Sequence, residues 1–169
     1  MLTNTNRGTG GANPTGDGSD TPTNGTKRAF SETIVKDVLR QCFEEGGDPD
    51  CILAGPAHKQ DFSGFTGNAT RFKGAEDNTL VASIEIYRSD FGDLQVKPAR
   101  YLNGVSGTDT TGIREALVIQ TDMWALATLR APHMFDLARD GDSERRVVLA
   151  EYALESRNEK ASGIAADLS

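Results

Sequence analysis

The sequence contains few of the residues that metal, disulfide or redox sites require. Among its 169 residues are two cysteines, Cys42 and Cys51, and two histidines, His58 and His133. The cysteines form no CxxC pair, so we expect two reduced thiols in the core, no metal site and no cofactor. The histidines lie far apart in the sequence without triad spacing, which argues against a catalytic histidine.

Long apolar runs and clustered basic residues are also missing. No stretch approaches the roughly 20 apolar residues that a transmembrane helix needs, so we expect no membrane partner and no secretory leader. The formal net charge is −7, and the Lys and Arg residues are dispersed. This pattern argues against binding nucleic acid through phosphate contacts, although an acidic surface can face DNA without gripping it.

Residues 1–28 have almost no large apolar side chains. After Met1 the only one is Leu2, and the rest are mainly Gly, Thr, Asn, Asp and Pro. Such a segment buries too little apolar surface to offset a backbone ordering cost of about 1–2 kcal/mol per residue. We therefore expect residues 1–28 to be a flexible polar arm or loop and residues 29–169 to form the folded region.

The folded region is predicted to begin with a helix, a buried strand and a second, short helix. Ser31 suits an N-cap, and Gly46 and Gly47 suit the stop. A short apolar run at residues 51–54 then predicts a strand, and Pro56 suits the first turn of the helix that follows it. The first helix should bury one apolar stripe, formed by Ile34, Val35, Val38, Leu39, Cys42 and Phe43.

The remaining elements are predicted to be strands. Residues 80–87 alternate, and after a turn at residues 89–92 the alternation resumes with Leu94 and Val96, which indicates a hairpin. A strand is expected at residues 116–121, and its continuation through residues 123–126 fits either a strand or a short helix. Beyond a turn at Gly141, residues 147–154 predict a long strand. Together these elements predict a mixed α+β fold.

Three short motifs suggest a catalytic or metal site, but the residues around them do not fit such a site. The Gly141-Asp142-Ser143 triplet is followed by a predicted strand, and Arg145 stands where a nucleophile elbow needs glycine. Asp90-Phe91-Gly92 spells a kinase magnesium motif without the Gly-rich loop or catalytic loop of a kinase. The alternating acids from Asp140 to Glu144 lack the spacing of a calcium loop. We expect turns at all three places and no enzyme.

The order of the motifs nevertheless resembles a known family. The chain from about residue 28 to residue 168 is similar to the C-terminal portion of tailed-phage major head (major capsid) proteins with the Hong Kong 97-type fold. The matching positions, each weak alone, are Gly46-Gly47-Asp48-Pro49, Asp90-Phe91-Gly92, Leu129-Arg130, Gly141-Asp142-Ser143, Glu151 and Asn158 to Ala161.

This resemblance implies a structural subunit with parts of an axial and a peripheral domain. Such a subunit would self-assemble into hexamers and pentamers of an icosahedral shell that encloses packaged DNA, with scaffold, portal or decoration proteins as possible further partners. It implies a virion location, with assembly in the host cytoplasm. The expected assembly contacts are the Asp90, Phe91 and Gly92 turn and Arg130, and the final strand should pack one face on its domain.

The sequence departs from the family in one respect. Head proteins of this type carry an N-terminal arm, an extended loop and a long spine helix, which this sequence lacks, so we expect Met1 to mark an internal start or a fragment boundary. Without the spine helix, the isolated chain should be marginally stable or prone to associate. Two alternatives stay open: a head-decoration or tail-associated binding protein and, less favoured, a small hydrolase that uses Ser143.

Overall fold

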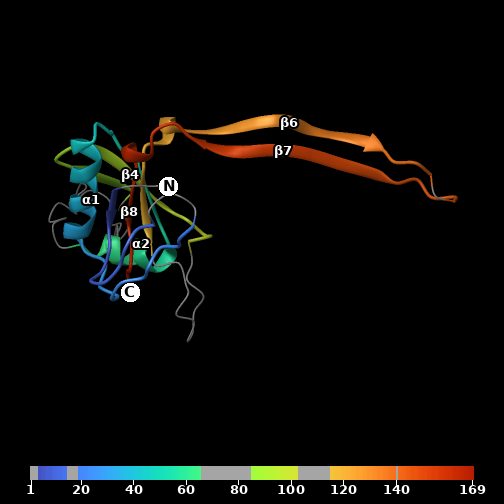
Figure 1. Ribbon diagram of the computed structural model, residues 1–169. Coiled ribbons are helices and arrows are strands. Elements are labelled where there is room, and N and C mark those ends of the chain that lie inside the picture. Colours follow the sequence, from blue (N-terminus) through green and yellow to red (C-terminus); the bar gives the residue numbers. More distant parts are fainter. Residues whose placement is uncertain (1–3, 15–18, 66–84, 103–114, 140) are drawn as a thin grey trace, which may run out of the picture. The chain divides into compact units, whose positions relative to one another are not determined.

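The computed structural model describes residues 4–14, 19–65, 85–102, 115–139 and 141–169. The chain divides into two compact units (Figure 1). Unit 1 contains the residues up to Thr121 together with Asn158–Ser169, and unit 2 contains Asp122–Arg157. The α+β class expected from the sequence fits this structure, because unit 1 combines two helices with a sheet.

A six-stranded mixed sheet forms the centre of unit 1. Its strand order is β1-β8-β5-β2-β4-β3, and its strands are β1 (Asn4–Asn6), β2 (Cys51–Ala54), β3 (Ile86–Ser89), β4 (Gly92–Pro98), β5 (Ala116–Ile119) and β8 (Gly163–Ala165). The β1–β8 and β2–β4 pairs are parallel, and the other neighbours are antiparallel. The first and last strands of the chain therefore lie side by side.

One face of this sheet carries the core. Ile52 of β2 is the register partner of both Val96 in β4 and Val118 in β5, so the three side chains share one row. They are at most 3% exposed, and they belong to the same apolar cluster as the buried residues of both helices. The next register pair of β2 and β5, Leu53 and Leu117, points to the opposite face of the sheet and is only half-buried.

Helix α1 (Glu32–Glu44) follows the predicted boundaries closely. Ser31 occupies the N-cap position in an extended conformation, although its side chain makes no capping hydrogen bond. Gly46 adopts a φ of +83° after the last turn, and the Gly47 amide donates to the Cys42 carbonyl at 2.8 Å, which ends the helix. Five positions of the predicted stripe are buried, whereas Phe43 is 54% exposed and lies off the core.

Helix α2 (Pro56–Ser63) begins at Pro56, as predicted, directly after β2. Its two buried side chains are His58 and Phe62, and the Phe62 ring meets the Tyr87 ring edge-on with centroids 5.3 Å apart. The predicted hairpin is also confirmed, because β3 and β4 pair antiparallel around the turn at residues 90–91. Residues 80–84 of the predicted strand lie outside the described residues.

The N-terminal segment differs from the flexible arm expected for residues 1–28. Asn4–Asn6 form β1 and pair in parallel with β8, and Asn4 is only 6% exposed. Arg28 forms an isolated parallel bridge with Leu168. The expectation rested on apolar content, whereas main-chain hydrogen bonds and polar side chains hold the described part of this segment.

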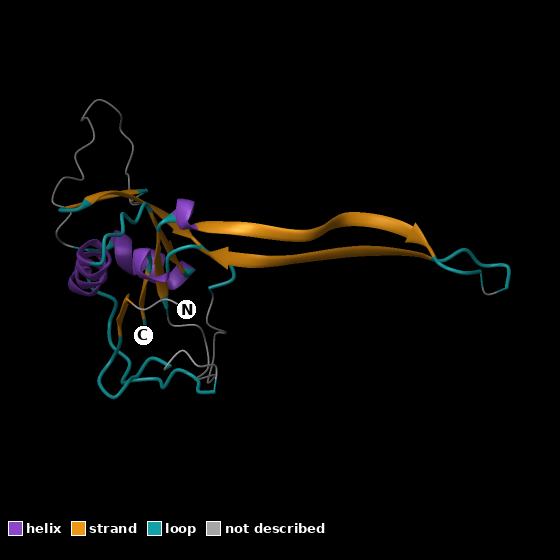
Figure 2. Cartoon of the chain, turned by 45° about the horizontal axis from the view of Figure 1, so that its top comes forward, coloured by secondary structure: helices purple, strands orange, loops and turns teal. Residues whose placement is uncertain are grey.

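Unit 2 is a two-stranded antiparallel ribbon of β6 (Trp124–Asp136) and β7 (Arg146–Ser156) (Figure 2). A short 3₁₀ turn (Thr121–Met123) precedes β6, which resolves the open choice for residues 123–126, and a second one (Glu159–Ala161) precedes β8. The long predicted strand is confirmed, whereas the packing of one of its faces on its domain stays a prediction. No residue of β7 is buried, and its partner is β6.

Candidate assembly surfaces

The predicted contact at Asp90-Phe91-Gly92 is the turn that joins β3 to β4. The Ser89 hydroxyl fixes this turn, since it accepts a hydrogen bond from the Phe91 amide at 3.2 Å and donates one to the Gly92 carbonyl at 2.9 Å. Gly92 has a φ of +144°, a conformation that side chains with a Cβ rarely adopt. The sequence therefore specifies a rigid turn that holds Phe91 in place.

Phe91 stacks on Phe43 at the end of α1. The ring centroids lie 4.9 Å apart with an interplanar angle of 30°, and Phe43 is 54% exposed. Two exposed carboxylates border these rings, Asp90 in the turn and Asp48 beside Gly92. We call Phe43, Phe91, Asp48 and Asp90 the acidic end of unit 1.

Arg130, the other predicted contact, lies on β6 in unit 2. Its Nε lies 3.2 Å from the Glu151 carboxylate on β7. This cross-strand ion pair sits between two register shifts in β6, where the pairing changes between Thr128 and Arg130 and again before His133. Because both side chains are substantially exposed, the pair contributes little stability and marks the irregular part of the ribbon.

One face of the ribbon carries a row of exposed apolar side chains. Leu126 is the register partner of Leu154, Met134 is the partner of Val148, and Tyr152 lies on the same face between these pairs. All five are between 61% and 69% exposed. We call these five residues the apolar ribbon face. An isolated two-stranded ribbon is marginally stable in water, so this face is suited to contact with other protein surface.

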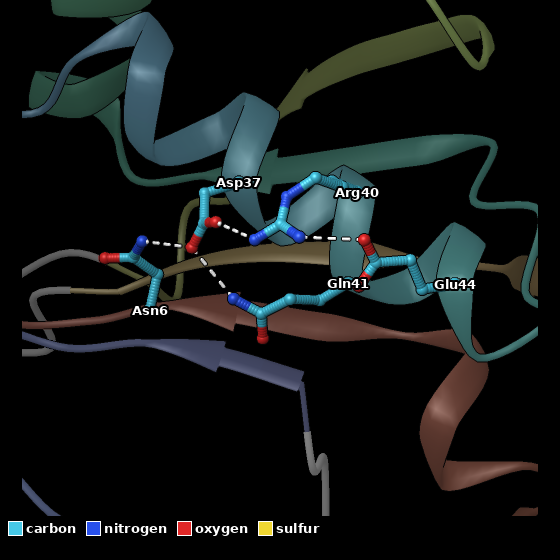
Figure 3. A network of polar contacts seen from close by, with 5 residues as sticks. All are labelled: Asn6, Asp37, Arg40, Gln41 and Glu44. Atoms are coloured by element: carbon cyan, nitrogen blue, oxygen red, sulfur yellow. Dashed lines mark hydrogen bonds and ion pairs between the residues drawn. The ribbon is translucent and has the colours of Figure 1, made fainter.

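A polar network fixes β1 to α1 (Figure 3). The Asp37 carboxylate accepts hydrogen bonds from the Asn6 side chain at 2.6 Å, and from Arg40 and Gln41 at 2.8 Å each. Arg40 also donates to Glu44 at 2.8 Å. Burial raises the pKa of Asp37, but the hydrogen bonds from Arg40, Asn6 and Gln41 outweigh this effect and hold the pKa below its ordinary value.

The point where the chain leaves unit 1 is also held by side chains. The Asp50 carboxylate accepts hydrogen bonds from the Thr121 amide at 2.7 Å and from the Thr121 hydroxyl at 2.6 Å. The preceding residue, Gln120, accepts from the Asp48 amide at 2.9 Å, and its own amide donates to the Ser162 hydroxyl at 3.1 Å. The last residues of unit 1 before the ribbon therefore have fixed positions.

Close backbone contacts join the N-terminal segment to the C-terminal residues. Asp167, which is 6% exposed, accepts a hydrogen bond from the Gly8 amide at 3.0 Å, and its carbonyl accepts one from the Arg28 amide at 2.9 Å. A Cβ on Gly8 would lie 2.0 Å from the Thr26 carbonyl oxygen, so only glycine fits there. These contacts hold the described part of the segment in place although it has so few apolar residues.

The geometry gives no support to the hydrolase reading. Ser143 follows an exposed turn in which Gly141 has a φ of +77°, and the next element is strand β7 rather than the helix that a nucleophile elbow needs. His58 is buried on α2 of unit 1, with Nδ1 3.5 Å from Asp61. His133 lies on β6, where its Nδ1 is 3.0 Å from the Ala131 carbonyl oxygen.

Within the described ranges, no group of three or more His, Cys, Asp or Glu side chains could hold a metal ion. None of the described helices is long and apolar enough to cross a membrane. Both cysteines are buried as free thiols, as expected, and burial raises the pKa of each. The acidic end of unit 1 and the apolar ribbon face are therefore the candidate surfaces for contact with a partner.

Sequence reasoning missed the place of Phe43 in the acidic end and the role of Asp167 in holding the N-terminal segment. It assigned Phe43 to the core stripe because Leu39 precedes it by four positions, and nothing in the periodicity separates it from the buried residues. It also missed Asp167, whose role depends on contacts with residues more than 130 positions away. The signal that did succeed was the Ser89–Gly92 turn, which placed Phe91 correctly at a hairpin tip.

Comparison with known proteins identifies the class of protein to which this chain belongs. The chain belongs to the SU10 major capsid protein family, which matches residues 1–169. Proteins of this class are structural components of phage heads. The resemblance to tailed-phage head proteins is thus confirmed at the level of a phage capsid protein, whereas the Hong Kong 97-type fold stays a prediction.

A curated relative supports the same assignment. The major capsid protein of Escherichia phage Phieco32 is 29% identical to this chain over 140 residues. The match covers 82% of this chain and 38% of the relative, so the chain spans less than half of the length of that protein.

Proposed function

We propose that this chain serves as a structural subunit of an icosahedral phage head and assembles into hexamers and pentamers that enclose packaged DNA. Family membership supports the structural role. The single observation in the structure that supports assembly is the apolar ribbon face, where five large side chains are more than 60% exposed. A contiguous exposed apolar face of this kind is typical of a surface that another protein covers.

The two-unit organisation supports the Hong Kong 97-type arrangement of an axial and a peripheral domain. Unit 1 is interrupted by the ribbon and completed by the residues that follow it. We assign unit 1 to the axial domain and the ribbon to the peripheral domain. In this assignment the Phe91 turn and Arg130 contact neighbouring subunits from different domains of the same chain.

The charge of the chain is consistent with a shell that encloses DNA without binding it sequence-specifically. The formal net charge is −7. On the ribbon, Arg130, Arg139 and Arg146 lie in ion pairs with acidic residues instead of forming a basic patch. DNA would therefore be held by the closed shell, with scaffold, portal or decoration proteins as further partners during assembly in the host cytoplasm.

Sedimentation of the native source tests this function. Lysate from infected cells is separated on a sucrose gradient, and peptides of this chain are located by mass spectrometry. We expect the peptides to be abundant in the fast fraction that contains filled heads, at many copies for each portal ring. Peptides confined to slow fractions would overturn the head role. Particles that keep their shell after the protein is stripped off would indicate a decoration protein.

A further inference from the structure

Unit 1 has a second charged end that complements the acidic end. At the far end of β4 from the Phe91 turn, Lys97 and Arg100 are exposed, and the side chain of Tyr101 is 92% exposed. Within the described part of the chain neither basic side chain has an ion-pair partner. We call Lys97, Arg100 and Tyr101 the basic end of unit 1.

The acidic end has the opposite charge and a similar aromatic content. Nearby acids are already paired, Asp93 with Arg88 and Glu44 with Arg40. Asp48 and Asp90, in contrast, have no ion-pair partner among the described residues. Each end therefore combines an exposed aromatic side chain with two charges that are unpaired in the described chain, and aromatic residues and arginine are enriched at protein interfaces.

The two ends cannot meet within one chain. Gly92 begins β4 beside the acidic end and Pro98 closes it beside the basic end, and strands β2 and β4 run parallel between them. Seven residues of strand separate the ends by about 20 Å. Only a second copy can bring an acidic end to a basic end.

We propose that unit 1 associates head to tail, with the Phe43–Phe91 pair, Asp48 and Asp90 of one copy against Lys97, Arg100 and Tyr101 of the next. This contact rests on the proposed function and names the surfaces that would join neighbouring subunits. Because it joins two different surfaces, each copy keeps one free end for a further copy, and repetition produces a ring when the rotation closes. Opposite charges at the two ends also suppress the wrong head-to-head and tail-to-tail pairings.

A charge-swap experiment on the full chain tests the contact. One variant, Asp48→Lys with Asp90→Lys, has two basic ends, and the other, Lys97→Glu with Arg100→Glu, has two acidic ends. Sedimentation velocity over a concentration series should show association of the wild-type chain. Each double variant alone should need at least about tenfold more protein to associate, because like charges then face each other. An equimolar mixture of the two variants should recover association.

Matched controls separate a local contact from a general effect of charge. The pair Asp136→Lys with Glu144→Lys changes the net charge as the first variant does but lies in unit 2, where each acid pairs with an arginine of the ribbon, and it should associate like the wild type. Phe43→Ala and Tyr101→Ala change no charge and should each weaken association. Thermal unfolding of every variant verifies that unit 1 is folded.

Three outcomes would overturn this contact: a wild-type chain that stays monomeric, double variants that associate as the wild type does, or a mixture that does not recover. Association through the apolar ribbon face alone would give the second outcome. Peptides found in filled heads together with a failed swap would overturn only this contact. A successful swap with peptides absent from heads would overturn the head role and leave the contact in place.

Discussion

The Asp37 carboxylate of helix α1 accepts a hydrogen bond of 2.6 Å from the side chain of Asn6, 31 residues earlier in the chain. This bond connects the edge strand β1 to the helix that covers the core face of the sheet. Asp37 also accepts from Arg40 and Gln41 on its own helix. One carboxylate thus holds the N-terminal strand against a helix that would otherwise contact it through few apolar residues.

Replacing Asp37 should loosen this connection. We expect Asp37→Ala to lower the free energy of unfolding of unit 1 by about 1–3 kcal/mol, because three hydrogen bonds to a charged group are lost. Asp37→Asn keeps one acceptor oxygen and should cost less. Urea unfolding followed by circular dichroism measures both, and an unchanged midpoint in Asp37→Ala would refute a stabilising role.

The same residue predicts a pH dependence with a defined sign. The pKa of Asp37 is lower in the folded chain than its ordinary value of 3.8, so its contribution is fully present above that value. It is lost as the pH falls below 3.8 through the lowered pKa. The difference in unfolding free energy between wild type and Asp37→Ala should therefore be constant near neutral pH and shrink in acid. A difference that grows on acidification would contradict the assignment.

Gly163 should not tolerate a side chain. A Cβ at this position of β8 would lie 2.5 Å from Val38 Cγ1 on α1 and 2.9 Å from the Asn4 carbonyl oxygen. We expect Gly163→Ala to destabilise unit 1 by about 1–3 kcal/mol through overpacking. Val38→Ala should recover part of this loss in the double variant, measured as a coupling energy in a double-mutant cycle. Purely additive effects would show that the helix does not press on this glycine.

The contact between Asp50 and Thr121 should control local opening where the chain leaves unit 1. Asp50→Ala removes the acceptor for both the amide and the hydroxyl of Thr121. By analogy with loss of a helix cap, we expect a cost of about 0.5–2 kcal/mol. Hydrogen exchange should speed up at the Thr121 amide and leave the amides of α1 unchanged. Equal acceleration at both places would indicate general unfolding instead.

The two thiols should react slowly in the folded chain. Burial raises the pKa of Cys42 and of Cys51, so the reactive thiolate is scarce at neutral pH, and both side chains are at most 4% exposed. We expect both to react with an aromatic disulfide reagent only after denaturant is added. Rapid labelling of either cysteine under native conditions would contradict its buried position.

The sequence predicted the local elements of unit 1 well because their signals are local. The Ser31 and Gly46 boundaries, the Pro56 start and the Ser89–Gly92 turn depend on the conformational preferences of a few adjacent residues. Each appears in the structure within a residue or two of the predicted place.

The elements that were missed depend on distant partners. Asn4–Asn6 has no apolar alternation, and it becomes a strand only because β8 pairs with it. The exposure of β7 could not be predicted either, since both of its faces contain apolar residues and alternation alone does not reveal which face is covered. The turn that carries Phe91 was predicted, whereas its stacking partner Phe43 was assigned to the core.

The position of β8 between β1 and β5 has a consequence for synthesis. Strand β1 precedes the ribbon in the chain and pairs with β8, which follows it, so the whole ribbon is translated between the two partners. Until residues 163–165 emerge, β1 lacks the one neighbour it has among the described strands, and β5 has an open edge. The sheet of unit 1 therefore cannot be completed until the ribbon has been translated, and the nascent chain exposes that edge for the time needed to make the ribbon.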